Sequence, residues 1–488
     1  MEMDAYQLII MAAGYFALLL LVSRLSGGRG DNDAFFRGCR RSPWWAVAFG
    51  MIGASISGVT FVSVPGMVSG VQMTYLQTCM GFFFGYVFVA FVLLPVYYRL
   101  NLTSIYTYLQ DRLGDVSYRT GAIIFFVSKM LGASIRLYLV CAIMQRFIFD
   151  HYGIGFPMTA AVVLLLIWLY TRQSGIKTIV WSDCIQTLVL LSALMLITTC
   201  ICDKMDIGLS GAYDIIRDSG MDRVFVLDDA TDRQYFWKQF VSGIFIVIVM
   251  TGLDQDMMQK NLTCRTLGQS QLNMCVNGAL YLPVNFLFLI LGVLLYAFCN
   301  HQGIDKPSSG DELLPMLCAS GSLGQWAMAF FTLGIVAAAF SSADSAMTSL
   351  TTCLCVDIIQ RPNDVRLRKI VHPLVAVAIL ILIVIVRSVN STSVIDAVYV
   401  VCSYTYGPLL GLFAFGMLTR RCTREKFVPV SCLLPPMICY MLDIAVSQHT
   451  GYRFGYELLM INGLLTFAFL MLTSAKLGAN DGRCNGDV

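Results

Sequence analysis

One short segment concentrates oxygen-bearing side chains inside an apolar stretch. Residues 337–350, AAAFSSADSAMTSL, carry five hydroxyl groups and one carboxylate between two apolar runs of helical composition. We therefore expect the segment in the middle of a membrane span, and a loop outside the membrane is the less favoured alternative. On a helix, i+3 and i+4 spacing places four of these side chains on one face: Ser341, Asp344, Ser345 and Thr348. Such hard oxygens suit Na⁺ or another alkali ion, whereas a polar seam between helices is the alternative.

A second segment, residues 50–66, combines helix-weakening residues with hydroxyls. Its sequence, GMIGASISGVTFVSVPG, holds four glycines, one proline and four Ser or Thr residues. Glycine and proline weaken a continuous helix, so we expect a helix that is unwound in mid-membrane. Such a break frees carbonyl groups that can bind a cation and presents helix ends to a substrate. Close packing of small residues against a neighbouring helix is the alternative.

Charged residues within apolar runs are functional hypotheses, because burying a charge in a membrane is costly. Asp183 lies in GIKTIVWSDCIQT, where hydration at the membrane interface is the alternative reading. Arg136 lies in SKMLGASIRLYLV and needs an anionic partner or water, which a carboxylate of the protein or helix carbonyls could also provide. Asp254 and Asp256 precede Lys260 near a predicted helix end and are expected in an inner gate or an ion-pair network.

The composition identifies the elements that must position these residues. Of 488 residues, 57% are hydrophobic and 13% charged, which indicates a polytopic membrane protein. The net charge of +3 gives no reason to expect nucleic-acid binding, and the seventeen cysteines suggest small hydrophobic residues rather than a disulfide framework. The start of the chain lacks a basic region and a clear cleavage site, so we expect a retained first span. The predicted helices are thirteen: 5–23, 44–70, 73–98, 119–149, 156–171, 177–203, 236–258, 271–299, 322–358, 369–388, 394–418, 427–447 and 454–475.

The distribution of basic residues predicts the orientation. Alternate loops and the tail after residue 475 hold 22 Lys and Arg, whereas the opposite loops hold six, four of them in the long segment 204–235. That segment is expected to contain a short surface helix. Since basic residues stay in the cytoplasm, we expect an extracytoplasmic N-terminus and a cytoplasmic C-terminus in a multi-pass protein of the cell (inner) membrane.

Three motifs together resemble the sodium:solute symporter family: ASISGVTFVSVPG, IVWSDCIQT and AAAFSSADSAMTSL occur in its order and spacing, and YGPLLGLFAFGML adds support. The resemblance covers about residues 1–475. It implies an all-α membrane protein with a five-plus-five inverted repeat of the leucine-transporter type and discontinuous helices. The implied parts are an extra helix with a cytoplasmic loop (1–43), a first repeat (44–203), an extracytoplasmic loop (204–235), a second repeat (236–418), and two additional helices with a short tail (419–488).

The resemblance also implies ion ligands. The family's main sodium site uses carbonyls of the broken helix and hydroxyls of the ninth span, which here correspond to Gly53, Ile56, Ala338, Ser341 and Ser342. Some members bind a further sodium with the sixth-span aspartate and more oxygens of the ninth span, which here correspond to Asp183, Asp344 and Ser345. Asp344 stands where several members have a neutral residue, which leaves the charge of that second site open.

Substrate contacts in the family come from the broken helix and from neighbouring spans. The implied set here is Ser55, Ser57, Thr60, Tyr75, Cys79 and Arg136. Galactose and sialic acid members have Glu or Gln where this chain has Cys79, and Val247 stands near the position of a galactose-binding Asn. Arg136 offers a planar fork that matches a carboxylate, so we expect an anionic solute such as a sialic acid, with a neutral sugar or polyol as the alternative.

The resulting prediction is a sodium-driven importer of a small organic solute that works by alternating access. No bond chemistry is expected, so the chain is not predicted to be an enzyme. Its expected partners are the solute, sodium ions and the lipid bilayer, and one copy is expected to suffice. A membrane sensor on a transporter-like fold is the alternative from another class, and a channel is a third, although no pore-loop filter is visible.

Overall fold

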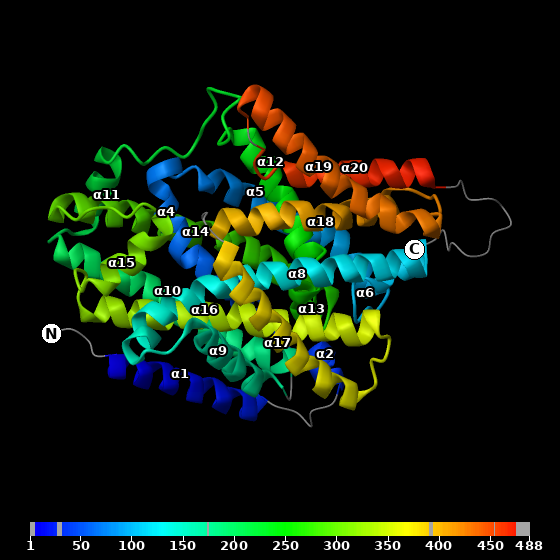
Figure 1. The fold of residues 1–488 in the computed structure, drawn as a ribbon, viewed down its shortest axis with the longest axis horizontal. Helices are drawn as coiled ribbons and strands as arrows, with labels where there is room; N and C mark the ends of the chain where they lie inside the picture. Colours follow the sequence, from blue (N-terminus) through cyan, green and yellow to red (C-terminus); the bar gives the residue numbers. More distant parts are fainter. Residues whose placement is uncertain (1–4, 27–31, 173–174, 390–393, 453, 475–488) are drawn as a thin grey trace.

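The computed structural model describes residues 5–26, 32–172, 175–389, 394–452 and 454–474, and within these ranges the chain forms helices and no strands. Figure 1 shows most long helices running side by side, with α1 starting and α20 ending at opposite ends of the bundle. Nine helices of the described chain are long and apolar enough to cross a membrane. They comprise α1 (Ala5–Ser26), α5 to α6 (Tyr75–Arg99), α8 (Asp115–Met144), α10 (Ile176–Lys204), α14 (Leu267–Gln302), α16 with its last turns (Gln325–Ile358), α17 (Val365–Val389), α18 (Val394–Leu418) and α19 (Val428–Thr450).

Two bent helix pairs and two shorter apolar helices occupy the remaining predicted spans. The pairs are α3 (Trp44–Ser55) with α4 (Gly58–Val71), bent by 54°, and Phe236–Gly252 with α13 (Gln255–Asn261), bent by 70°. The shorter helices are α9 (Phe156–Thr171) and α20 (Leu458–Thr473). Within the described residues, all thirteen predicted spans are therefore helical. The short helix expected in segment 204–235 is α11 (Leu209–Asp218).

The first broken helix lies where the sequence predicts it. Helix α3 ends at Ser55, Ile56 leaves the helical conformation, and Ser57 is extended before Gly58 begins α4. The small residues also allow close packing against a neighbouring helix, which is the alternative explanation for this segment. A Cβ at Gly50 would lie 2.8 Å from Asp183 Cβ, and one at Gly53 would overlap Thr187 Oγ1. The glycines thus let α3 approach α10 beside Asp183, so the break and the close packing occur together.

The second broken helix corrects a prediction. The segment 236–258 was predicted as one helix, but helix α12 (Phe236–Val247) and the π-helical turn Ile248–Gly252 end before Leu253. Asp254 then caps α13, because its Oδ1 accepts a hydrogen bond of 2.8 Å from the backbone N–H of Asp256. A carboxylate at this position satisfies one of the free N–H groups at a helix start.

Helix α16 is the most enclosed of the nine long membrane-span candidates in the described chain. Every residue from Ile335 to Thr352 is buried except Ser342, which is half-buried. The helix packs against α10 and α8, and α10 packs in turn against α3. The oxygen-rich segment 337–350 therefore lies in mid-span, and the alternative of an extramembrane loop is wrong. Fifteen cysteines of the described chain carry free thiols.

Candidate functional site

A cavity of about 100 Å³ lies between the breaks of the two broken helices. Its lining comes from seven parts of the chain, and it mixes hydroxyls and charges with aromatic rings. Among the residues that face it are Ala54, Ser55, Ser57, Thr60, Phe82, Tyr86, Lys129, Arg136, Val247, Thr251, Asp254, Asp256, Tyr281, Ser341, Ser342, Tyr399, Cys402 and Tyr406. A concave site with a few convergent polar groups is the usual form of a small-molecule binding site.

Four of the six residues predicted to contact substrate line this cavity. Ser55, Ser57 and Thr60 face it from the first break, and the Ser55 hydroxyl lies 3.3 Å from the hydroxyl of Tyr86. Arg136 faces it from α8. Within the described part of the chain, no acidic side chain forms an ion pair with Arg136, so the alternative of a protein carboxylate as its partner finds no support.

Tyr75 and Cys79 lie outside this lining. Both are buried in α5, and the Tyr75 hydroxyl lies 3.1 Å from that of Tyr399, whose side chain does face the cavity. Tyr75 also lines a second cavity of about 250 Å³, which is bordered by Arg233 of segment 204–235. The Tyr75–Tyr399 contact therefore separates the central cavity from this second one.

The residues predicted for the main ion site converge on the first break. The hydroxyls of Ser341 and Ser342 face the cavity together with Ser55 and Ser57. The Cβ of Ala338 would lie 3.8 Å from a Cβ built at Gly58. Ser342 Oγ is buried and has no hydrogen-bond partner among the described residues. An unpartnered buried hydroxyl next to a broken helix fits the donor set that a sodium ion needs.

Gly53 and Ile56, the other two residues predicted for the main site, are buried at the same break. Gly53 packs against Thr187 of α10, and Ile56 is the first residue beyond α3. Their predicted role as carbonyl ligands stays a prediction.

The residues predicted for the second ion site form a buried hydrogen-bonded cluster. Ser341 donates a hydrogen bond of 2.8 Å to Asp183 Oδ1. Asp344 accepts hydrogen bonds from Tyr170, at 2.7 Å, and from Ser345, at 3.1 Å. Asp183 and Asp344 are close enough to act on each other electrostatically. Two carboxylates together in a membrane interior favour a bound cation.

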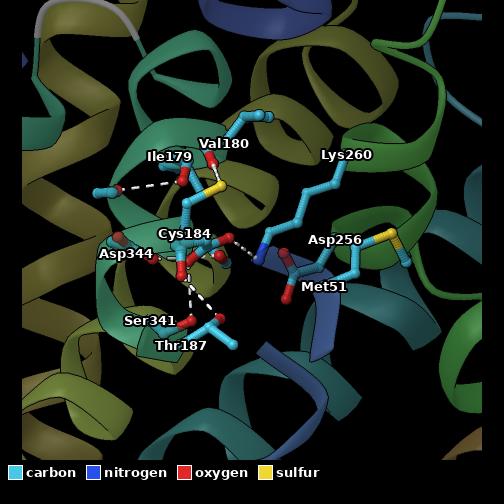
Figure 2. Close-up of polar contacts among 12 residues, drawn as sticks. Met51, Ile179, Val180, Cys184, Thr187, Asp256, Lys260, Ser341 and Asp344 are labelled. Atoms are coloured by element: carbon cyan, nitrogen blue, oxygen red, sulfur yellow. Dashed lines mark hydrogen bonds and ion pairs between the residues drawn. The ribbon is translucent and has the colours of Figure 1, made fainter. Parts of the chain in front are cut away.

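Lys260 also belongs to this cluster, which its place in the sequence did not indicate. The Lys260 ammonium lies 2.7 Å from Asp183 Oδ2, and the dashed line from its nitrogen in Figure 2 marks this ion pair. Both side chains are only 1% exposed. The sequence signal was a lysine four positions after Asp256 on an apolar helix, but the spacing along the chain gave no indication that its partner is Asp183.

A second ion-pair group lies beside the cavity. Lys129 contacts Asp254 at 3.1 Å and Asp256 at 2.6 Å, and Tyr406 donates a hydrogen bond of 2.8 Å to Asp254. The expected ion-pair network of the two aspartates is thereby confirmed. It joins α8 and α18 to the second break.

This arrangement defines a class of protein. Two helices broken in mid-membrane, a polar cavity between their breaks, and buried carboxylates beside it are the architecture of a secondary active transporter. The alternative of a channel would need a continuous pore with a filter, and the breaks here enclose a cavity instead.

Comparisons with known proteins identify the transporter family to which the chain belongs. The sodium:solute symporter family model matches residues 35–426, and the chain belongs to this family. The sodium/iodide cotransporter of Homo sapiens is 25% identical over 442 residues, which are 84% of this chain and 66% of that protein. The sodium/sialic acid symporter SiaT of Proteus mirabilis is 25% identical over 430 residues, 84% of each chain. A solved structure of a Na⁺-coupled sialic acid symporter in its substrate-bound outward-open state has a TM-score of 0.81 at 20% identity, covering 96% of this chain and 99% of that one.

Proposed function

We propose that this chain imports an anionic organic solute, such as a sialic acid or another carboxylate, together with sodium. The observation that carries the proposal is Arg136, a cationic side chain that faces the central cavity without an acidic partner among the described residues. Lys129, the other cation of the lining, is neutralised by Asp254 and Asp256. A guanidinium binds a carboxylate through two parallel hydrogen bonds, so a carboxylate in the cavity would compensate its charge.

Hydroxyl groups that line the cavity together with Arg136 also support an anionic solute. Ser55, Ser57 and Thr60 line the same cavity and offer hydroxyl donors. The solutes named for two relatives, iodide and sialic acid, are anions, which agrees with a cationic site. Val247 lines the cavity where a sugar-binding member would present an amide, and this departure disfavours a neutral sugar.

Sodium binding is proposed at the two groups of residues that the fold brings together. The main site would use Ser341 and Ser342 with backbone carbonyls of Gly53, Ile56 and Ala338. The second site would use the carboxylates of Asp183 and Asp344 with the hydroxyl of Ser345. Both groups lie on α16 and on helices packed against it, so ion binding would tie α3 and α10 to α16.

We propose a transport cycle that uses these sites. Sodium stabilises the conformation in which α3 is held against α16, solute closes the outer side, and the bundle then opens inward. Ion and solute each favour the same conformation, so their binding is coupled reciprocally. The cycle makes and breaks no covalent bond, so we assign no enzymatic activity. One copy of the chain holds the complete cavity, and we propose that a monomer is sufficient.

We further propose the predicted repeats and orientation. Each broken helix stands at the start of one predicted repeat, α3 and α4 in 44–203 and α12 and α13 in 236–418. The flanking parts would then be 1–43, 204–235 and 419–488. The excess of basic residues in alternate loops places the N-terminus outside and the C-terminus in the cytoplasm of the cell (inner) membrane.

Uptake into proteoliposomes tests the proposal. Radiolabelled sialic acid and a short monocarboxylate should accumulate against their gradients with external Na⁺, and replacing Na⁺ by K⁺ should abolish accumulation. A neutral sugar of similar size serves as the matched control and should not accumulate. Sodium-driven accumulation of the sugar alone would contradict the anionic assignment, and solute flux without any sodium dependence would contradict symport.

A further inference from the structure

Lys260 places a positive charge of the protein at a position proposed for a sodium ion. Its ammonium lies 2.7 Å from one oxygen of Asp183, and the other oxygen of that carboxylate accepts the hydrogen bond from Ser341. Ser341 is in turn a proposed sodium ligand. A sodium ion bound between Ser341 and Asp183 would therefore lie beside the ammonium, and two like charges at that distance in a membrane interior repel each other strongly.

A second carboxylate, that of Asp256, also faces the Lys260 ammonium. Figure 2 shows the Asp256 carboxylate pointing toward the Lys260 nitrogen from the same helix, α13. Asp256 Oδ2 contacts Lys129 at 2.6 Å, but its Oδ1 is buried without a hydrogen-bond partner among the described side chains. Asp256 also acts electrostatically on Lys260. Lys260 therefore has three acidic neighbours, Asp183, Asp256 and Asp344, and Asp256 retains an oxygen without a hydrogen bond among the described residues.

We propose that Lys260 is an internal competitor of sodium at Asp183. Its ammonium neutralises Asp183 when no ion is bound there, and it moves toward Asp256 when sodium arrives. This inference rests on the proposed function, because it assigns the second ion to Asp183. It gives Lys260 a positioning role, since the lysine acts on sodium through the carboxylate and touches neither the solute nor its cavity.

The exchange would couple ion binding to the second broken helix. Lys260 belongs to α13, whereas Asp183 belongs to α10, which packs on the first broken helix. In the ion-free protein the Lys260–Asp183 pair ties α13 to α10. Sodium at Asp183 releases this tie, and the Lys260 ammonium then shares the Asp256 carboxylate with Lys129 of α8. A change of ion occupancy is thereby converted into a change of contacts at the break beside the solute cavity.

Sodium binding to the purified full-length chain, measured without solute, tests the inference. The readout is the NaCl concentration that half-saturates the sodium-dependent rise in melting temperature, with choline chloride holding the ionic strength constant. Lys260→Met removes the competing charge and should lower this concentration by about tenfold, within the range usual for coupled sites. Lys260→Arg retains a cation and should stay near the wild type. In sodium-free buffer, Lys260→Met should melt earlier than the wild type, because Asp183 is left unpaired, and sodium should restore its stability.

Asp256→Asn provides a second, independent variant. It removes the alternative acceptor, so the ammonium should stay on Asp183 and the half-saturating sodium concentration should rise. Asp254→Asn is the matched control, because Asp254 also pairs with Lys129 but is not among the acidic groups that act on Lys260. In the Lys260→Met background, the effect of Asp256→Asn should shrink, as expected when two residues act on one property through each other.

The outcomes separate this inference from the proposed function. A wild-type protein without any sodium-specific stabilisation would overturn the proposed symport. A wild-type response that Lys260→Met leaves unchanged or weakens would overturn the inference alone and show a fixed structural ion pair. If Lys260→Met does not fold, Asp256→Asn still decides, because an effect no larger than that of Asp254→Asn contradicts the exchange.

Discussion

The backbone of Gly66 in α4 is in direct contact with the backbone of Gly310, the first residue of the short helical turn Gly310–Glu312. A Cβ added at Gly66 would overlap the Gly310 carbonyl group, and a Cβ at Gly310 would overlap that of Gly66. The Gly66 carbonyl also accepts a hydrogen bond of 2.7 Å from the Tyr296 hydroxyl. Both glycines border the second cavity, on the side of segment 204–235. Helix α4, the second half of the first broken helix, can therefore pack against this turn only because neither residue has a side chain.

This contact predicts the effect of a single methyl group. Gly66→Ala should destabilise the conformation in which α4 contacts this turn by about 1–3 kcal/mol, the usual cost of overpacking a close contact. Equilibrium binding of solute in sodium should persist, whereas the rate of sodium-driven uptake should fall. Gly70→Ala, one turn further along α4, is the matched control, because a Cβ there meets nothing within 4 Å. Equal uptake rates in the two variants would contradict a role for the Gly66–Gly310 contact in the cycle.

The main ion site predicts altered sodium dependence. Ser341→Ala or Ser342→Ala removes one neutral ligand without changing the apolar packing of α16. Each should raise the sodium concentration for half-maximal uptake severalfold while the amount of protein in the membrane stays constant. Ser349→Ala is the control, since the Ser349 hydroxyl bonds back to the carbonyl of Ala346 on the same helix. Unchanged sodium dependence in both site variants would refute the assignment.

The first broken helix could be predicted because its signal is local. Four glycines and a proline within residues 50–66 weaken the helix wherever it lies in the fold. The second break has no comparable density of such residues: FWKQFVSGIFIVIVMTG reads as a continuous apolar helix. Its only local signal is Asp254, which caps the following helix, and the same residue type also fits the end of a span.

The ion pairs depend on tertiary packing and could not be predicted as pairs. Asp183 stood out as a charge within an apolar run, and Lys260 followed Asp254 and Asp256 near a predicted helix end. Their partners come from helices distant along the chain, so their spacing gave no information about which charges meet. The small residues Gly50 and Gly53 decide the Asp183 position by setting the approach of α3 to α10, and this effect appears only in three dimensions.

Asp183 predicts the number of sodium ions transported with each solute. Asp183→Asn removes the charge that would hold a second ion, so the ion-to-solute ratio or the Hill coefficient for sodium should decrease. The substitution also breaks the buried Lys260–Asp183 ion pair and leaves the ammonium to Asp256, so stability should fall, by no more than the roughly 3–5 kcal/mol that an uncompensated buried charge costs. The double variant Asp183→Asn with Lys260→Met removes both charges and should regain stability without regaining the second ion. A wild type that already transports one sodium per solute would assign Asp183 a structural role.

Arg136 predicts the chemical class of the solute. Lysine retains the positive charge but offers a point charge in place of a planar fork, so Arg136→Lys loses the paired hydrogen bonds to a carboxylate. Affinity for an anionic solute should fall by about tenfold or more, roughly 1.4 kcal/mol, near the lower range for a hydrogen bond to a charged group. The sodium-dependent melting temperature without solute should stay close to that of the wild type, since Arg136 is absent from both proposed ion sites. Arg146→Lys, an exposed arginine further along the same stretch of chain, is the matched control and should bind solute normally. Tight sodium-dependent binding of an uncharged sugar that Arg136→Lys leaves undiminished would show that Arg136 supports the fold and that the cavity selects its solute through hydroxyl contacts.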